Sequence, residues 1–142
     1  MSDSLENRQP AVRVWLLAVC LLITAMVLIG GVTRLTGSGL SITDWEPIMG
    51  AIPPLSDADW ESAFAKYRQI PQFKFVNSTM SIGEFKSIYF WEWFHRLVGR
   101  LIGVVSFLPG IYFSARGQIS KRLALRVLLG IALGGSQGAL GW

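Results

Sequence analysis

The chain has 142 residues, of which 51% are hydrophobic and only 15% are charged, well below the ~25% charged residues of an average soluble domain. This composition excludes disorder and collagen-like repeats, and the apolar residues gather into blocks, which indicates that a bilayer surrounds much of the chain. The chain has 13 Lys and Arg against 9 Asp and Glu. In a membrane protein such an excess of positive charge usually reflects how the spans are oriented, because Lys and Arg concentrate in cytoplasmic loops. We therefore expect no nucleic-acid partner.

The first predicted element is a membrane-spanning helix. Residues 1–13 are polar, and residues 14–32 then carry no charge over 19 positions, close to the ~20 residues that cross the hydrocarbon core. We therefore predict a cytoplasmic tail at 1–13 and a transmembrane helix at 14–33. A cleaved signal peptide is the alternative, although the apolar region of such a peptide is only ~7–15 residues long.

The following segment, 34–83, is predicted to be an extracytoplasmic loop with structure of its own. It is rich in proline, glycine and aromatic residues, and its aromatic content is too high for disorder. Ser56 and Asp59 fit a capping box at the start of a helix. Aromatic residues then recur at helical spacing: Trp60, Phe64 and Tyr67. We expect a short amphipathic helix over residues 56–68.

A long helix that includes the second transmembrane segment is predicted over 84–115. Residues 101–115 carry no charge but contain Pro109, and the apolar pattern continues backward to about residue 82. A helix of this length exceeds the thickness of the hydrocarbon core. We therefore expect its first turns to project beyond the membrane.

Positive charges then crowd the predicted loop at 116–126: Arg116, Lys121, Arg122 and Arg126. The positive-inside rule applies best to short loops, so we place this loop in the cytoplasm. A third transmembrane helix is predicted over 127–142, with a stripe of small residues suited to helix packing: Gly130, Gly134 and Gly138. Because the apolar run stops at Trp142 without a polar flank, we expect it to be truncated and the chain to be the front part of a longer protein.

The residues best suited to chemistry lie between 91 and 100. On a helix, Glu92 shares a face with His95 and can pair with Arg96, while Arg100 follows one turn later. Ionisable residues at membrane depth are functional candidates, and His95, the sole histidine, suits an axial haem ligand. The alternatives are an interfacial histidine bonded to a loop and an interfacial salt-bridge cluster.

A second candidate cluster follows the first span, over residues 30–41. Arg34 lies there among hydroxyl side chains and glycines, and a guanidinium with freed backbone amides can bind carboxylates such as haem propionates. A flexible helix exit with a snorkelling arginine is an equally good interpretation of the same residues.

Three stretches of this sequence resemble the N-terminal half of the haem A synthase family. They are GGVTRLTGSGLSITDWEPIMGAIPP from Gly30, MSIGEFKSIYFWEWFHRLVGRLIG from Met80 and LLGIALGGSQGALGW from Leu128. The resemblance implies an all-α integral membrane protein in which this chain supplies three transmembrane helices of a four-helix haem-binding half-bundle, the full family protein having eight helices. It also implies an enzyme, a membrane haem-modifying oxidoreductase that converts haem O to haem A for cytochrome oxidase biogenesis by oxidising a ring methyl group to a formyl group.

The resemblance also implies roles for the candidate residues. His95 would be an axial ligand of the haem iron, Glu92 would assist catalysis, and Arg34, Arg96 and Arg100 would hold propionates. The second axial ligand would lie on a fourth helix. Haem O is then the substrate, and haem b is a cofactor of the full-length protein. The implied partners are the haem O synthase, an unidentified electron donor, membrane lipid and a second copy of the chain.

One departure from the family concerns cysteine. Some bacterial members carry a cysteine pair in the first external loop, and residues 34–83 contain no cysteine, so the chain resembles the branch that includes alphaproteobacterial and mitochondrial members. The N-terminus lacks an Arg-rich presequence, which favours a bacterial inner membrane with the N-terminus in the cytoplasm. The competing interpretations are a haem-binding electron-transfer subunit without haem-modifying activity and a purely structural membrane fragment that binds no haem.

Overall fold

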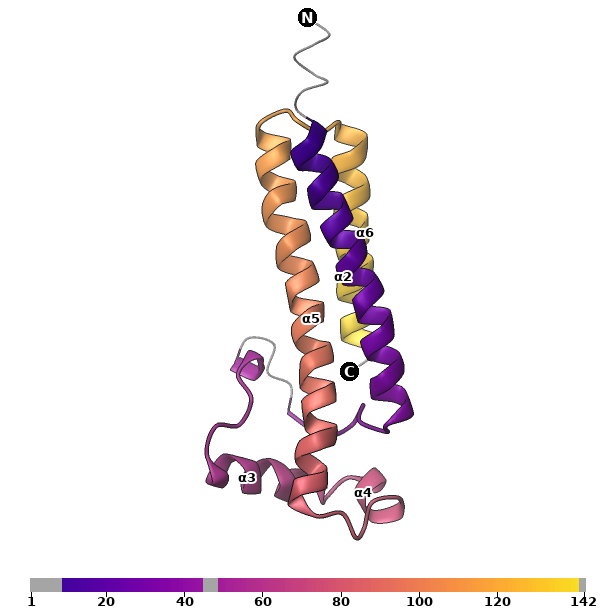
Figure 1. Cartoon of the computed structure of the whole chain (residues 1–142), viewed down its shortest axis with the longest axis vertical. Helices are drawn as coiled ribbons and strands as arrows, with labels where there is room; N and C mark the ends of the chain where they lie inside the picture. Colours follow the sequence, from indigo (N-terminus) through magenta and orange to yellow (C-terminus); the bar gives the residue numbers. More distant parts are fainter. Residues whose placement is uncertain (1–8, 45–48, 141–142) are drawn as a thin grey trace, which may run out of the picture. The chain divides into compact units, whose positions relative to one another are not determined.

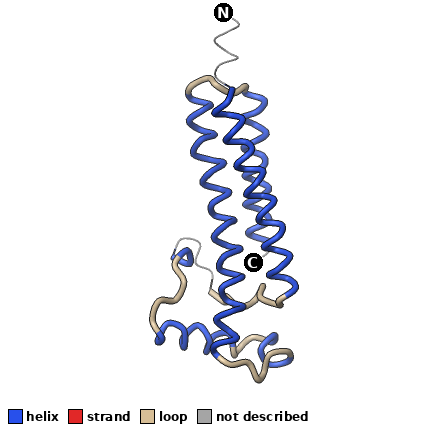
Figure 2. The backbone as a smooth tube through the Cα atoms, in the orientation of Figure 1, coloured by secondary structure: helices blue, strands red, loops and turns tan. Residues whose placement is uncertain are grey.

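The computed structural model describes residues 9–44 and 49–140. Over these ranges the chain forms five α-helices and one 3-10 turn, with no strand (Figure 2). The elements in chain order are α2 (Gln9–Leu35), η1 (Met49–Ala51), α3 (Asp57–Tyr67), α4 (Pro71–Phe75), α5 (Ile82–Ala115) and α6 (Lys121–Leu140). The predicted all-α fold is confirmed.

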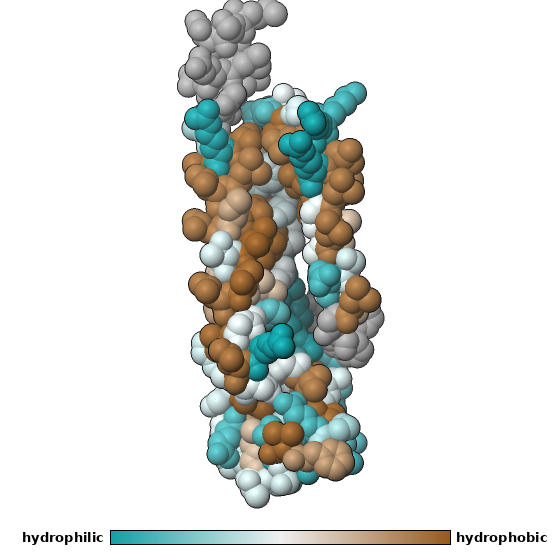
Figure 3. Space-filling view, turned by 90° about the vertical axis from the view of Figure 1, so that its right-hand side faces the viewer, coloured by the Kyte–Doolittle hydropathy of each residue, from teal (hydrophilic) through white to brown (hydrophobic). Residues whose placement is uncertain are grey.

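Helices α2, α5 and α6 are long and apolar enough to cross a membrane. The spanning stretches are Pro10–Leu35, Ile82–Ala115 and Lys121–Leu140. Large apolar side chains point outward along these helices (Figure 3), as expected where lipid instead of water covers the surface. The chain is therefore a multi-pass membrane protein, and each of the three predicted spans coincides with one of these helices.

The helices extend further than the charge-free runs that predicted them. Helix α2 begins at Gln9 and α6 begins at Lys121, so the predicted loop at 116–126 shortens to 116–120. The Ser120 hydroxyl accepts a hydrogen bond from the Leu123 N–H at 3.2 Å and caps α6. A charge-free run marks the hydrocarbon core, whereas a helix continues into the interface, where long basic side chains reach water. Residues 1–8 of the predicted tail and 141–142 of the third span lie outside the described residues.

The contacts within the chain divide it into two compact units. The bundle unit contains residues 9–26 and 98–140, and the loop unit contains residues 27–44 and 49–97. Each unit is described by itself below. The candidate site residues Glu92, His95 and Arg96 belong to the loop unit.

The bundle unit packs the first half of α2 against the second half of α5 and against α6 (Figure 1). Its core centres on Val12, Trp15 and Phe113. Pro109 lies inside α5 and has no N–H to donate to the carbonyl four residues earlier, that of Val105. The indole Nε1–H of Trp15 donates to this carbonyl instead, at 2.7 Å. The contact between helices thus satisfies the acceptor that the proline leaves open within the membrane.

We expect Trp15→Phe to destabilise the protein by about 1 kcal/mol beyond its packing loss, because the Val105 carbonyl then lacks a donor. In a Pro109→Ala background, α5 supplies its own N–H to that carbonyl, and the extra cost should disappear. Unfolding of the four proteins in detergent measures this difference as a double-mutant cycle. If Trp15→Phe lowers the free energy of unfolding equally in the wild type and in Pro109→Ala, the proposed role of the indole is contradicted.

The loop unit has an aromatic core where α3, α4 and the start of α5 meet. Phe64, Tyr67 and Phe85 are buried, and the rings of Tyr67 and Phe85 lie 5.1 Å apart between centroids. The Tyr67 hydroxyl accepts a hydrogen bond from the Asn77 side-chain amide at 2.7 Å. The predicted capping box at Ser56 and the helix after it are both confirmed. The segment between the first two spans is therefore a packed structure.

Candidate functional site

The acidic side chain of Glu92 is held inside the loop unit by three donors. Glu92 lies on α5 and is only 3% exposed. One carboxylate oxygen, Oε2, accepts hydrogen bonds from the Ser41 hydroxyl at 2.7 Å and from the Ile42 N–H at 2.8 Å. The other oxygen, Oε1, lies 2.7 Å from Nη2 of Arg96. Both oxygens are thereby fixed in position.

The path of the chain after α2 brings Ser41 to Glu92. Gly37 has a φ of +64°, a left-handed conformation that ends a helix and that glycine adopts without strain. The Ser38 N–H then donates to the Thr33 carbonyl at 2.9 Å, and the Ser41 N–H donates to the Ser38 carbonyl at 3.1 Å. Ser38 and Ser41 are almost completely buried. These turns fold the loop back against α5.

Arg96 joins the loop and Glu92 into one network. Its Nη2 donates to the Ile42 carbonyl at 3.2 Å as well as to Glu92. The pair has the i, i+4 spacing predicted from the sequence, with exposed side-chain fractions of 23% for Arg96 and 4% for Glu92. A buried charge is costly unless it is paired and hydrogen-bonded. The arginine and the loop donors together stabilise the carboxylate in this position.

His95 lies one residue before Arg96 on α5 and is half-buried. Among the described residues, no hydrogen bond to its imidazole is present. The ring faces Gly30 of α2, where a Cβ atom would lie 3.2 Å from Nε2 and 3.6 Å from Cδ2. Glycine at position 30 therefore leaves the space that this imidazole occupies.

We expect Gly30→Ala to displace the imidazole of His95 by a few tenths of an ångström, because a contact of 3.2 Å is too tight to persist. His95 is the sole histidine, so its ring signals in an NMR spectrum are unambiguous. Those signals should shift in Gly30→Ala. Gly31→Ala is the matched control, since a Cβ there meets nothing within 4 Å. Identical spectra for the two variants would contradict the packing described here.

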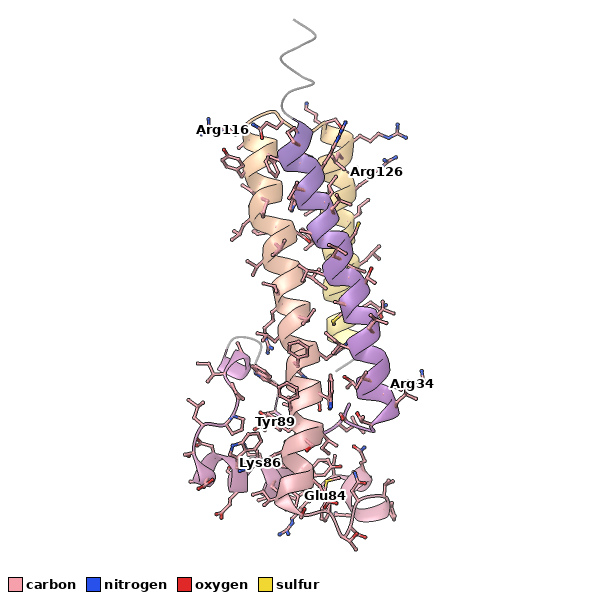
Figure 4. All side chains as sticks on the ribbon, viewed as in Figure 1. Arg34, Glu84, Lys86, Tyr89, Arg116 and Arg126 are labelled. Atoms are coloured by element: carbon pink, nitrogen blue, oxygen red, sulfur yellow. The ribbon has the colours of Figure 1, made fainter. Side chains whose placement is uncertain are left out.

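The other two predicted propionate-binding residues, Arg34 and Arg100, lie on α2 and α5. Arg34 is exposed at the last turn of α2, and its side chain points away from α5 (Figure 4). In this position its charge stays in water and faces the negative end of the helix dipole. Arg100 is partly buried on α5, in the bundle unit.

Ser41 lies at the end of the second candidate cluster, but the sequence did not connect Ser41 or Ile42 with Glu92. Ser41 and Ile42 supply two of the three donors to Glu92, yet they are 51 and 50 positions away from it in the chain. The only sequence signal was the polar, glycine-containing run after the first span, which was interpreted around Arg34. Every residue except proline has a backbone N–H, so the residue type at position 42 gives no sign that its N–H donates to Glu92.

The residues present suit the binding of a haem. The imidazole of His95 is half-buried, lacks a described hydrogen bond and lies beside a residue without a side chain. Imidazole nitrogen is a common axial ligand of haem iron. On the same helix, Glu92 lies three residues before His95, and its ion-pair partner Arg96 follows His95 directly.

The chain has three helices that can span a membrane. It also has a hydrogen-bonded ion pair beside the imidazole of His95. These features define a helical membrane protein with an internal polar site. Comparison with known proteins then identifies the group. Residues 13–142 match the family described as cytochrome oxidase assembly protein, and the chain belongs to this family.

Several curated relatives carry the name haem A synthase. The protein from Methylobacterium radiotolerans is 57% identical over 143 aligned positions, covering 100% of this chain and 39% of the relative. That of Nitrosomonas eutropha is 52% identical, covering 100% of this chain and 40% of the relative. The protein from Paracoccus denitrificans is 54% identical, and the alignment covers 96% of this chain and 36% of the relative. The chain thus spans about two fifths of the length of these relatives. No solved structure matches it.

Proposed function

We propose that the chain is the N-terminal, substrate-binding half of a haem A synthase. The activity is the oxidation of a methyl group of haem O to the formyl group of haem A, for the assembly of cytochrome oxidase. The names of the relatives and the family match support this assignment. The observation that carries it is the half-buried imidazole of His95 beside Gly30, at a position of α5 between the paired residues Glu92 and Arg96.

In this proposal His95 is an axial ligand of the iron of haem O. The bound haem iron supplies the redox chemistry, and the protein positions the substrate and controls the charge around it. Glu92 is a fixed negative charge, because donors occupy both of its oxygens. Such a charge stabilises positive charge that develops on the substrate during oxidation. This arrangement favours electrostatic assistance by Glu92 over proton transfer.

The arginines are proposed to hold the haem propionates. A guanidinium binds a carboxylate through paired hydrogen bonds. Arg34 has an exposed side chain with room for such a partner, whereas Arg96 already binds Glu92 and Ile42. Arg100, one turn after Arg96, is the third proposed propionate residue.

The rest of the assignment concerns the whole protein. We propose that the remainder of the intact enzyme carries haem b, that a haem O synthase supplies the substrate and that an unidentified electron donor is a further partner. Homo-oligomers are also proposed. The location is a bacterial inner membrane, with the N-terminus in the cytoplasm and residues 34–83 on the outer side.

The test is production of haem A by the intact protein in membranes of a host that makes haem O and has no haem A synthase of its own. Extracted haems are separated by chromatography and identified by mass. Haem A in the extract is the expected result. Bound haem without conversion would overturn the proposal and support the electron-transfer subunit, and a protein without haem would overturn both.

A further inference from the structure

A groove lies between α5 and α6 in the bundle unit. Its volume is about 580 Å³, within the ~300–1,000 Å³ typical of ligand sites. It runs from Ser114 and Lys121 at one end to Ser106 and Ile131 at the other, about 12 to 15 Å along the helices. This path is parallel to the helices that cross the membrane.

The walls of the groove are apolar. Its lining includes Phe107, Ile111, Leu125 and Leu128, and each of these side chains is about half exposed. No side chain of α6 is buried within the part of the chain that the structure describes. An apolar surface of this shape accepts a hydrocarbon chain lying along the helices.

One end of the groove is strongly basic. Lys121 is part of the lining. Further exposed basic side chains surround it at this end: Arg116, Arg122 and Arg126. Figure 4 shows Arg116 and Arg126 at the same end of the helices. The sequence places no Asp or Glu within residues 9–26 or 98–140 of the bundle unit, so nothing described there repels an anion.

We propose that this groove is a binding site for an anionic phospholipid of the surrounding bilayer. The phosphate binds Lys121 and Arg122, and one acyl chain lies in the groove between α5 and α6. Basic pockets between membrane helices recognise anionic head groups in this way. Positive charge at one end and an apolar lining along the remainder match the two parts of an anionic phospholipid, its head group and its acyl chain. The site does not depend on the proposed enzymatic function.

The experiment is native mass spectrometry of the purified, delipidated protein. Phosphatidylglycerol or phosphatidylcholine with identical acyl chains is added back, and the bound lipid is counted. We expect tighter binding of phosphatidylglycerol. Each basic residue near an anionic head group contributes roughly fivefold to binding, so Lys121→Gln combined with Arg122→Gln should weaken phosphatidylglycerol binding by roughly 25-fold. Phosphatidylcholine binding should change little.

Two further variants separate charge from shape. Lys74→Gln removes an exposed positive charge from α4 in the loop unit and should leave lipid binding unchanged. Ala124→Phe narrows the groove while keeping its basic residues and should reduce phosphatidylglycerol binding. Equal binding of the two lipids, or full binding by the Lys121/Arg122 double variant, would overturn the proposal. Full binding by Ala124→Phe would show that the lipid does not occupy the groove and would overturn it as well.

Discussion

Glu92→Gln is expected to abolish the formation of haem A while haem remains bound to the protein. Glutamine keeps the size of the side chain and removes its charge. Its single carbonyl oxygen can accept the hydrogen bonds from Ser41 and Ile42, but the amide nitrogen then faces Arg96 and cannot accept from it. Loss of one preorganised electrostatic group at a reacting centre typically lowers turnover by roughly 100- to 1,000-fold.

The measurement compares the ratio of haem A to haem O in membranes that contain the wild type or the variant, together with the total haem per protein. Glu61→Gln is the matched control, because it makes the same charge change at an exposed position on α3. It should give wild-type amounts of haem A. Normal haem A output from Glu92→Gln would remove Glu92 from the mechanism. Loss of haem together with product would assign Glu92 to binding or folding instead.

His95→Ala is expected to lower the haem content of the protein by roughly tenfold or more, since loss of an iron ligand costs at least as much as loss of a group that orients one. The absorption spectrum of the remaining haem should also change. The cause is the loss of the imidazole nitrogen that lies beside Gly30.

Exogenous imidazole provides the control for this experiment. The alanine variant has an empty space where the side-chain ring was, and a free imidazole that enters it should restore part of the haem spectrum. Rescue of this kind distinguishes a lost ligand from a misfolded protein. Unchanged haem occupancy and an unchanged spectrum in His95→Ala would exclude His95 as an axial ligand.

Local rules of helix geometry explain what could be predicted about the site. Glu92 and Arg96 are four residues apart, and any helix at this position brings such side chains within pairing distance. The capping box of Ser56 and Asp59 depends on residues three apart. These interactions require only that a helix forms, and the residues themselves favour it.

Pro109 leaves the Val105 carbonyl without a donor from α5, and the sequence did not predict which residue would donate to it instead. A proline in a membrane helix indicates that a carbonyl needs another donor, but the sequence contains six Trp and many hydroxyl groups that could supply it. Trp15 does so because α2 packs against α5 with its indole opposite Val105. The choice is a consequence of helix packing.

The sequence by itself determined the all-α membrane class, the three spans and the pairing of Glu92 with Arg96, because span length and helical spacing are local properties of the chain. Only the tertiary structure decided that Ser41 and Ile42 hold the carboxylate and that the side chain of Arg34 points away from α5. These outcomes depend on where the chain turns after α2 and on which surface of α5 it then meets. Contacts between residues some 50 positions apart arise from that folded path, and no local pattern specifies it.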